Sequence, residues 1–414
     1  MSSVTINDIK QASEALQGII HRTPLDLSRT FSELAHNQVY LKMENMQKTG
    51  SFKIRGAYNK IHNLSLIEKN RGVIAASAGN HAQGVAYAAA RAGLRAMIVM
   101  PEVAPLSKVM ATLGYGAEVT LSGQVYDEAF RRAQELQQEQ GFTFIHAFDD
   151  AQVIAGQGTI GLEILQELPD VSTIVVPIGG GGLIAGIATV VKGIAPHVRV
   201  VGVQASGAPA MYLSKKAAHI VTTKDAVTVA DGIAVKVPGT ITYEIIRKYV
   251  DEIVTVEEEE IAGAILMLLE RSKVSAEGAG AVSLAAILNG KIGGRGQKLV
   301  AVVSGGNIDV NVISRIIERG LVKAGRRILV ATPVTDRPGS LIKMLTIIAG
   351  LGVNVISISH DRIDPGVSLG QAEVVLSLET RDIGHAEELL RNLNREGYAV
   401  KVLRRTGDSK VIVE

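Results

Sequence analysis

The chain has 414 residues, with 43 basic and 41 acidic side chains, a length that accommodates two or three domains. Because it contains no cysteine, disulfides, thiolate nucleophiles and zinc–cysteine sites are excluded. The balanced charge, without a basic run interleaved with aromatic residues, gives no reason to expect nucleic acid or a membrane surface as a partner. Residues 1–11 show no charged segment followed by an apolar one, which is the pattern of a signal peptide. No apolar run approaches the ~20 residues of a membrane-spanning helix, so we expect a cytoplasmic protein.

Short Val- and Ile-rich runs alternate with longer helical patterns over roughly the first 320 residues. Their apolar content is continuous rather than alternating, as in parallel strands that are covered on both faces. The pattern predicts an α/β fold. Strands are expected at 72–77, 95–100, 117–121, 144–146, 173–176, 198–204 and 299–303, and helices at 80–92, around 110–113 and at 183–192.

Three polar segments of this region are candidates for ligand contacts. Lys53 lies between Phe52 and Ile54, where partial desolvation would lower its pKa towards Schiff-base chemistry; an ordinary surface lysine is the alternative. Residues 77–81 lie where the first long strand meets its helix, so their free N–H groups suit a carboxylate; an ordinary helix N-cap is the alternative. Ser304 directly follows the strand 299–303, and ligands of open α/β sheets bind at the carboxyl ends of strands, although a simple loop turn fits equally well.

Four consecutive glycines, Gly179, Gly180, Gly181 and Gly182, separate the strand 173–176 from the next helix. They let successive backbone N–H groups turn towards one anion, and the helix directs its positive end to the same place, so we expect a phosphate there rather than an unoccupied turn. The spacing Gly180-x-Gly182-x-x-Ala185 also fits a dinucleotide-binding loop. That fold requires an acidic residue at the end of the next strand, where this chain has Gln204 and Ala205, so a phosphate ester is favoured over NAD.

The pattern changes at the short basic stretch 323–326, which we take as a linker. Beyond it, the expected order is strand 328–334, helix 338–350, strand 353–360, strand 372–378, helix 385–397 and strand 399–403. This βαββαβ order is that of a ferredoxin-like domain over residues 327–414.

Taken together, the motifs SFKIRGA at 51–57, SAGNHAQG at 77–84, GGGGL at 179–183 and SGGN at 304–307 resemble the fold-type II pyridoxal-phosphate (PLP) enzymes. The resemblance is greatest to the threonine and serine dehydratases and covers roughly the first 320 residues in the right order. It implies a catalytic domain at 1–322 similar to the tryptophan synthase β subunit, with two α/β lobes and the smaller lobe inserted at roughly 50–150. The tail, with ATPVTDRPGSL at 331–341 and GVNVISISHDR at 352–362, resembles an ACT domain, an amino-acid-sensing module.

The resemblance also implies a role for each matching residue. Lys53, next to Phe52, carries the PLP and then acts as acid and base at the substrate Cα. Asn80 donates to the 3′-oxygen of the ring, Ser304 meets the pyridine nitrogen, and Gly179, Gly180, Gly181, Gly182 and Leu183 bind the phosphate. The loop of Ser77, Ala78, Gly79, Asn80 and His81 receives the substrate carboxylate. The reaction implied is the conversion of L-threonine to 2-oxobutanoate and ammonia, with L-serine as a secondary substrate.

Two departures from relatives narrow this expectation. Serine racemases of this family carry a second serine where Ala78 stands, so the alternative of a serine racemase is disfavoured relative to a dehydratase. Some relatives bind a metal through acids on a loop that matches Gln204, Ala208 and Ala210, none of which supplies a carboxylate, so we expect no metal. A serine hydroxyl at Ser304 cannot hold a pyridine nitrogen protonated, which favours β-elimination over transamination.

For the tail we expect an amino-acid effector site formed by Asp336, Arg337, Pro338, Gly339, Ser340 and Asn354, because the loop 336–340 joins a strand to a helix start with free N–H groups. The chain is expected to form a homodimer or homotetramer through this domain, with isoleucine as the first candidate effector and valine or serine next. A plain dimerisation domain is the alternative. For the whole chain, the alternatives are a dinucleotide-dependent oxidoreductase and a non-catalytic amino-acid sensor.

Overall fold

The computed structural model describes residues 4–363, 368–406 and 409–413. The chain divides into two compact units, Met1–Asp309 and Val310–Glu414. The predicted boundary at 323–326 lies near this division but stays a prediction.

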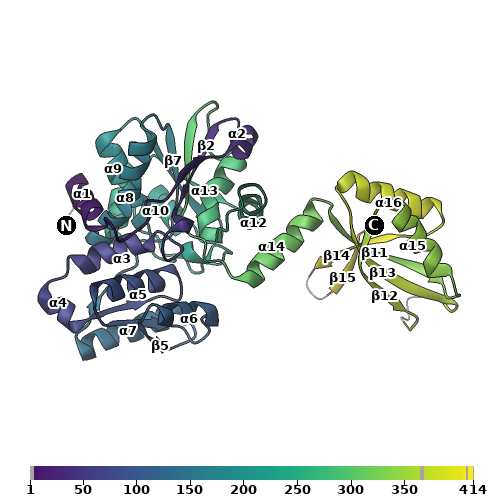
Figure 1. Ribbon diagram of the computed structural model, residues 1–414, viewed down its shortest axis with the longest axis horizontal. Helices are drawn as coiled ribbons and strands as arrows, with labels where there is room; N and C mark the ends of the chain where they lie inside the picture. The colour runs from purple at the N-terminus through teal and green to yellow at the C-terminus, as the bar shows by residue number, and fades with distance from the viewer. Residues whose placement is uncertain (1–3, 364–367, 407–408, 414) are drawn as a thin grey trace. The chain divides into compact units, whose positions relative to one another are not determined.

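A six-stranded sheet forms the larger lobe of the first unit, in the order β1-β2-β10-β7-β8-β9 (Figure 1). Its strands are parallel except for the edge strand β1, which pairs antiparallel with β2. Helix α13 packs against β7, β8, β9 and β10, α9 packs against β7 and β8, and α8 packs on α9. The strands are β1 (Leu25–Leu27), β2 (Gln38–Met43), β7 (Thr173–Pro177), β8 (Arg199–Ala205), β9 (Glu252–Val256) and β10 (Lys298–Val303).

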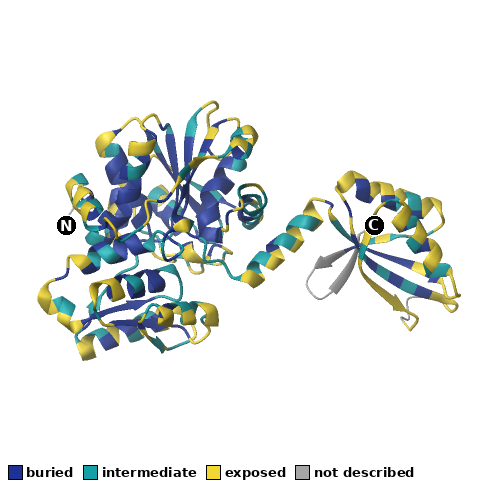
Figure 2. Cartoon of the chain, viewed as in Figure 1, coloured by how far each residue is buried: buried dark blue, intermediate teal, exposed yellow. Residues whose placement is uncertain are grey.

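A second, fully parallel sheet in the order β5-β4-β3-β6 forms the smaller lobe. Its strands are β3 (Val73–Ala76), β4 (Ala96–Met100), β5 (Glu118–Leu121) and β6 (Thr143–Phe144). Val73 and Ala75 belong to the core shared with α5, whereas Ile74 and Ala76 belong to the core shared with α7. Because both faces are covered, the central strands β3 and β4 are buried at every position (Figure 2), which explains their continuous apolar sequences.

The helices of the first unit connect and cover these sheets. They are α1 (Ile6–Ala15), α2 (Arg29–Ala35), α3 (Lys53–His62), α4 (Leu66–Arg71), α5 (Asn80–Ala92), α6 (Leu106–Gly114), α7 (Tyr126–Gln140), α8 (Ala151–Glu167), α9 (Gly182–Ile194), α10 (Ala210–Ala217), α11 (Thr240–Tyr249), α12 (Glu258–Met267) and α13 (Gly278–Leu288). Short helical turns are η1 (Glu44–Met46), η2 (Asp231–Ile233) and the π-helical turn η3 (Leu268–Ser272). No helix in the described ranges is long and apolar enough to cross a membrane.

The second unit begins with α14 (Val310–Lys323) and contains an antiparallel sheet in the order β12-β13-β11-β14-β15. Its strands are β11 (Arg327–Thr335), β12 (Asn354–Asp361), β13 (Gln371–Glu379), β14 (Lys401–Thr406) and β15 (Ser409–Val413), and its other helices are α15 (Ser340–Gly350) and α16 (Ile383–Arg395). Helices α15 and α16 share one apolar core with the sheet. The predicted ferredoxin-like βαββαβ order is confirmed, and β15 is an addition that the sequence pattern did not reveal.

The predicted α/β class is confirmed, and the helix at 80–92 has the bounds expected. Three strands of the large sheet, β1, β2 and β9, were missed. Strand β2 reads QVYLKM, so a buried lysine interrupts the apolar run that marks a buried strand, and β1 is only three residues long. Helix α15 begins at Ser340 rather than 338, because Gly339 takes a left-handed conformation (φ 90°) at the N-cap.

Candidate active site

The candidate site is formed by the segment before α3 and by the loops that follow β3 and β10. The loop after β7 reaches it through Phe148, which packs on Gly180 and follows Ala147, the acceptor of the Lys53 amine. The segment before α3 is tied to the loop after β10, because Phe52 N donates to Ser304 O at 3.1 Å and Ser51 forms a bridge with Gly305. The loop after β3 reaches the same place, since Asn307 Nδ2 donates to Asn80 Oδ1 at 2.8 Å. The structure therefore brings together the segments that carry Lys53, Asn80 and Ser304.

Lys53 is the first residue of α3, and its amine points to the chain that returns from the smaller lobe. Its Nζ donates to Ala147 O at 3.1 Å. Desolvation by burial lowers the pKa of Lys53 to about 8, although the Glu277 carboxylate opposes this shift. An amine with this pKa is substantially neutral at slightly alkaline pH, so it is available as a nucleophile and as a base.

The glycine loop follows β7 and leads directly into α9, whose N-cap Gly181 has φ 100°. A Cβ atom at Gly180 would lie 2.4 Å from the Phe148 ring, and one at Gly182 would lie 3.0 Å from the Phe148 backbone, so the loop has room only for glycine at these positions. Neighbouring side chains hold the carbonyls of the loop: Thr242 Oγ1 donates to Gly180 O at 2.6 Å and Gln204 Nε2 donates to Ile178 O at 3.3 Å. The result is a close-packed cradle at a helix N-terminus, which suits a phosphate group.

Buried polar groups surround the Lys53 segment. Ser304 is 2% exposed and its Oγ donates to Ala279 O at 3.2 Å. The hydroxyls of Thr49 and Ser51 are buried and have no hydrogen-bond partner among the described residues. Unpaired buried hydroxyls are costly in a protein core, so a bound molecule is their expected partner. Together with the cradle and the amine of Lys53, these groups fit pyridoxal phosphate.

The side chain of His81 differs from the rest of the loop at 77–81. It is buried, and its Nε2 donates to Ile145 O at 2.8 Å, which fixes a proton on Nε2. Desolvation and the nearby Lys53 lower the pKa of His81 to about 3. Its imidazole therefore packs the loop against β6, and only its backbone is left for a substrate carboxylate.

Several residues of the site were missed by the sequence analysis. The most prominent is Glu277, a buried carboxyl whose Oε1 accepts from Asn80 Nδ2 at 2.6 Å. Phe148 and Thr242 shape the glycine loop as described above. A usable signal existed for Glu277 alone, because an acid directly precedes the entirely apolar or small-residue helix α13.

In the loop that matches the metal site of some relatives, both polar atoms of the Gln204 carboxamide are hydrogen-bonded within the protein. Its Nε2 donates to Ile178 O, and its Oε1 accepts from Tyr212 N at 2.7 Å. Within residues 4–363, 368–406 and 409–413, no group of three or more His, Asp or Glu side chains is arranged to hold a metal ion.

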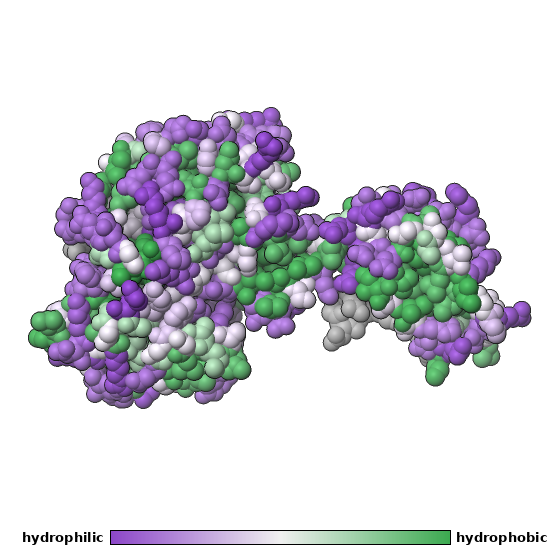
Figure 3. Space-filling model, viewed as in Figure 1, coloured by the Kyte–Doolittle hydropathy of each residue, from purple (hydrophilic) through white to green (hydrophobic). Residues whose placement is uncertain are grey.

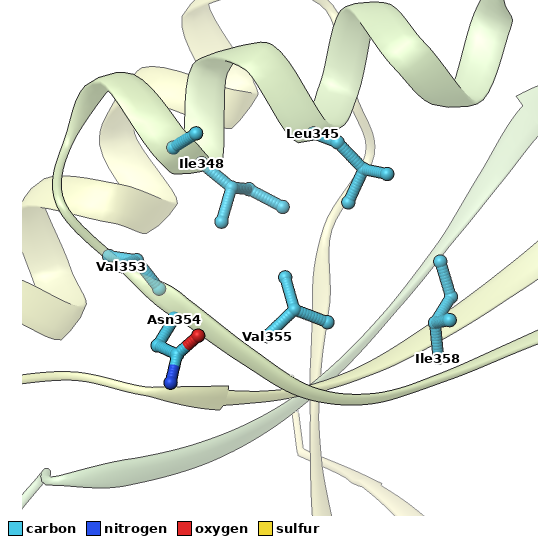
Figure 4. A pocket seen from close by; sticks show the side chains of 7 residues that line it. Leu345, Ile348, Val353, Asn354, Val355 and Ile358 are labelled. Atoms are coloured by element: carbon cyan, nitrogen blue, oxygen red, sulfur yellow. The ribbon is translucent and has the colours of Figure 1, made fainter.

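In the second unit, an open pocket of about 340 Å³ lies between α15 and β12 (Figure 4). It is lined by Leu345, Ile348, Ala349, Val353, Asn354, Val355 and Ile358. Of the six residues predicted to bind an effector, only Asn354 lines this pocket, and its Nδ2 donates to Glu379 at 3.3 Å. The loop 336–340 instead joins β11 to α15, where Asp336 accepts from Arg362 Nε at 3.0 Å.

Comparison with known proteins agrees with both units. A family model described as pyridoxal-phosphate dependent enzyme matches residues 16–305, and an ACT domain model matches residues 334–395. The chain is 54% identical over 400 residues to the L-threonine ammonia-lyase of Thermotoga maritima, covering 97% of this chain and all of the relative.

Two solved structures each align with more than three quarters of this chain. Maize serine racemase aligns with a TM-score of 0.73 and 35% identity, covering 78% of this chain and 99% of that one. The processed form of threonine deaminase isoform 2 from Solanum lycopersicum aligns with a TM-score of 0.71 and 38% identity, covering 77% and 95% of the two chains.

Proposed function

This chain belongs to the family of pyridoxal-phosphate dependent enzymes and carries a C-terminal ACT domain, and we propose that it converts L-threonine to 2-oxobutanoate and ammonia. The observation that carries the proposal is the amine of Lys53, whose pKa is lowered to about 8 and which lies among loops that match the dehydratases. The near full-length similarity to an L-threonine ammonia-lyase supports the choice of substrate.

The cofactor, when bound, supplies an electron sink that makes the Cα–H bond of the amino acid acidic. The glycine cradle at 179–182 with the N-terminus of α9 holds its phosphate, and Ser304 is the residue proposed to meet its ring nitrogen. Backbone N–H groups of the loop at 77–81 bind the substrate carboxylate at the start of α5. In this arrangement the substrate Cα would lie within reach of the Lys53 amine.

Lys53 then moves the proton. Its neutral amine removes the Cα proton, and the Cβ hydroxyl departs with a proton as water. The enamine that remains takes up one water and loses ammonia, so the net products are 2-oxobutanoate and ammonia. Because a serine hydroxyl does not hold the ring nitrogen protonated, charge on Cα is poorly stabilised and departure of the hydroxyl is favoured over return of a proton.

Elimination rather than racemisation follows from Ala78. A racemase needs a second proton donor on the face of Cα opposite the lysine, and a methyl group cannot provide one. The structural similarity to maize serine racemase therefore reflects the shared fold.

The second unit is proposed to bind a small amino acid and to pair with a copy from another subunit in a homodimer or homotetramer. The loop of Asp336, Arg337, Pro338, Gly339 and Ser340, together with Asn354, remains the proposed effector site. The pocket that Asn354 lines has branched aliphatic walls, which suits an isoleucine or valine side chain (Figure 4). Within one chain it lies at the end of the sheet opposite to the loop 336–340, because Asn354 pairs with Glu379 whereas Thr335 pairs with Gln371. A green, apolar surface over this unit is visible in Figure 3, as expected of a surface that another molecule covers.

The decisive experiment is release of 2-oxoacid from L-threonine and L-serine by the purified full chain, with and without isoleucine, valine and serine. Turnover of L-threonine with a shift in its KM by one of these amino acids is the expected result. Absence of 2-oxobutanoate contradicts the activity, and absence of any effect or calorimetric binding at millimolar concentrations contradicts the regulation. A cytoplasmic location is part of the same proposal and is tested by cell fractionation.

A further inference from the structure

Glu277 is a buried acid that the reaction described above does not use. It lies at the N-cap of α13 and is 5% exposed, yet its carboxylate does not cap its own helix. Instead its Oε1 accepts from Asn80 Nδ2 at 2.6 Å, a length typical of a charge-assisted hydrogen bond. Asn80 starts α5 of the smaller lobe, whereas Glu277 belongs to the larger lobe, so this bond joins the two lobes inside the site.

The second half of the Asn80 carboxamide is also fixed. Asn80 Oδ1 accepts from Asn307 Nδ2 at 2.8 Å, and the same Nδ2 donates to Thr49 O at 2.8 Å. The orientation of the carboxamide is therefore determined, because its oxygen faces Asn307 and its nitrogen must face Glu277. One hydrogen of Asn80 Nδ2 is left to donate to the 3′-oxygen of the cofactor.

Close packing fixes the position of the Glu277 carboxylate. A Cβ atom at Gly305 would lie 2.4 Å from Glu277 Oε1, and one at Gly232 would lie 3.3 Å from it. The charged groups that influence it are Asp231 and Lys108, which pair at 2.8 Å, and Lys53. Burial, with Asp231, raises the pKa of Glu277 to about 7, and its negative charge opposes the lowering of the Lys53 pKa.

We propose that Glu277 is a positioning residue of this site, which aims the Asn80 carboxamide at the cofactor ring and supplies a buried negative charge close to the Lys53 segment. The proposal deepens the lyase function, but its geometry does not depend on which amino acid is the substrate. Two variants separate its two parts. Glu277→Gln keeps an oxygen acceptor for Asn80 and removes the charge, whereas Glu277→Asp keeps the charge and withdraws the carboxylate by about 1.5 Å, which breaks the bond to Asn80.

The charge is tested on the full chain stripped of cofactor, without any turnover. Acetic anhydride labels Lys53 at a rate that follows its neutral fraction, and peptide mass spectrometry resolves this lysine over pH 6 to 10. The wild-type midpoint is expected near pH 8, and Glu277→Gln is expected to lower it by about one pH unit, because an opposite charge that favours the ammonium is lost. Glu252→Gln, which removes an exposed carboxylate of β9 paired with Arg199, is the control and should leave the midpoint unchanged. A midpoint in Glu277→Gln equal to that of the wild type overturns this part.

The positioning is tested by titration of pyridoxal phosphate into the same proteins, followed by absorbance. Glu277→Asp is expected to bind the cofactor about tenfold more weakly, as the loss of one charge-assisted hydrogen bond implies. Unchanged affinity in this variant overturns the positioning role. Circular dichroism identifies a variant that fails to fold. If one variant does so, Glu277→Gln still tests the charge, or Glu277→Asp still tests the positioning of Asn80. Failure of L-threonine turnover in the wild type would refute the proposed function and leave both of these results standing.

Discussion

A buried cluster of four charges that includes Arg55, two residues after Lys53, provides the sharpest test of what holds the site together. Arg55 is completely buried together with Glu44, and their side chains pair at 2.7 Å. Arg55 also pairs with Glu163 at 2.6 Å, and Lys42 pairs with the same carboxylate at 2.6 Å. Two positive and two negative charges therefore balance between β2, η1, α3 and α8, and this cluster fixes the start of α3.

We predict that Arg55→Met lowers the free energy of unfolding by about 3–5 kcal/mol, because it leaves a buried charge without its partner. In this variant Glu163 keeps Lys42 as its partner. Among the described residues, Glu44 keeps the hydroxyl of Thr23 and no charged partner, so the loss of stability comes mainly from the Glu44 carboxylate. Removal of that charge should restore much of the loss. The double variant Arg55→Met/Glu44→Gln is expected to cost less than the sum of the two single variants by about 2 kcal/mol, within the range measured for groups in contact.

The assay is equilibrium urea unfolding of the cofactor-bound chain, followed by far-UV circular dichroism because the chain has no tryptophan. Arg95→Met is the control. Arg95 and Glu118 form an ion pair at 2.8 Å in which both side chains are 52% exposed. Loss of this pair should lower the free energy of unfolding by less than about 1 kcal/mol. An Arg55→Met variant that loses no more than the control, or a double variant whose loss equals the sum, would refute the reasoning.

The same variant has a predictable pH dependence. Burial raises the pKa of Glu163, but Arg55 and Lys42 outweigh it, so the net pKa is lowered. A carboxylate with a lowered pKa contributes stability above its ordinary pKa, and this contribution is lost as the pH falls. The difference in free energy of unfolding between wild type and Arg55→Met should therefore become smaller on acidification. A difference that grows would show that Arg55 does not stabilise the ionised Glu163.

Three further outcomes concern the reaction. Lys53→Ala should reduce L-threonine turnover to below about a thousandth, equivalent to ~4 kcal/mol in the barrier, and a larger residual rate of 2-oxobutanoate release would show that Lys53 is not the base. The wild type should release 2-oxoacid from L-serine without forming D-serine, and Ala78→Ser should add slow D-serine formation by chiral chromatography; abundant D-serine from the unmodified chain would contradict the role given to Ala78. Ser304→Asp should keep the cofactor ring nitrogen protonated, slow elimination and change the visible spectrum of the bound cofactor. An unchanged rate and spectrum would show that Ser304 does not contact the ring.

Much of the architecture was determined by local sequence. The continuous apolar runs of β3, β4, β7 and β10 were recognisable because parallel strands are covered on both faces, and the order of elements in the tail gave the ferredoxin-like domain. The glycine loop and the segment around Lys53 were also recognisable, since special backbone geometry and motif order are local properties.

Only the tertiary structure decided which distant groups meet. Glu277 and Asn80 are 197 positions apart, and Arg55 and Glu163 are 108 apart, yet each pair is in hydrogen-bond contact. A periodic pattern reports which face of an element is buried but not what covers it, so a buried charge looks like an error in the pattern until its partner is known. Strand β2 was missed for this reason: it contains the buried Lys42, and the carboxylate that neutralises Lys42 comes from the distant helix α8. The pKa of Lys53 depends in the same way on burial and on Glu277, both of which exist only in the folded chain.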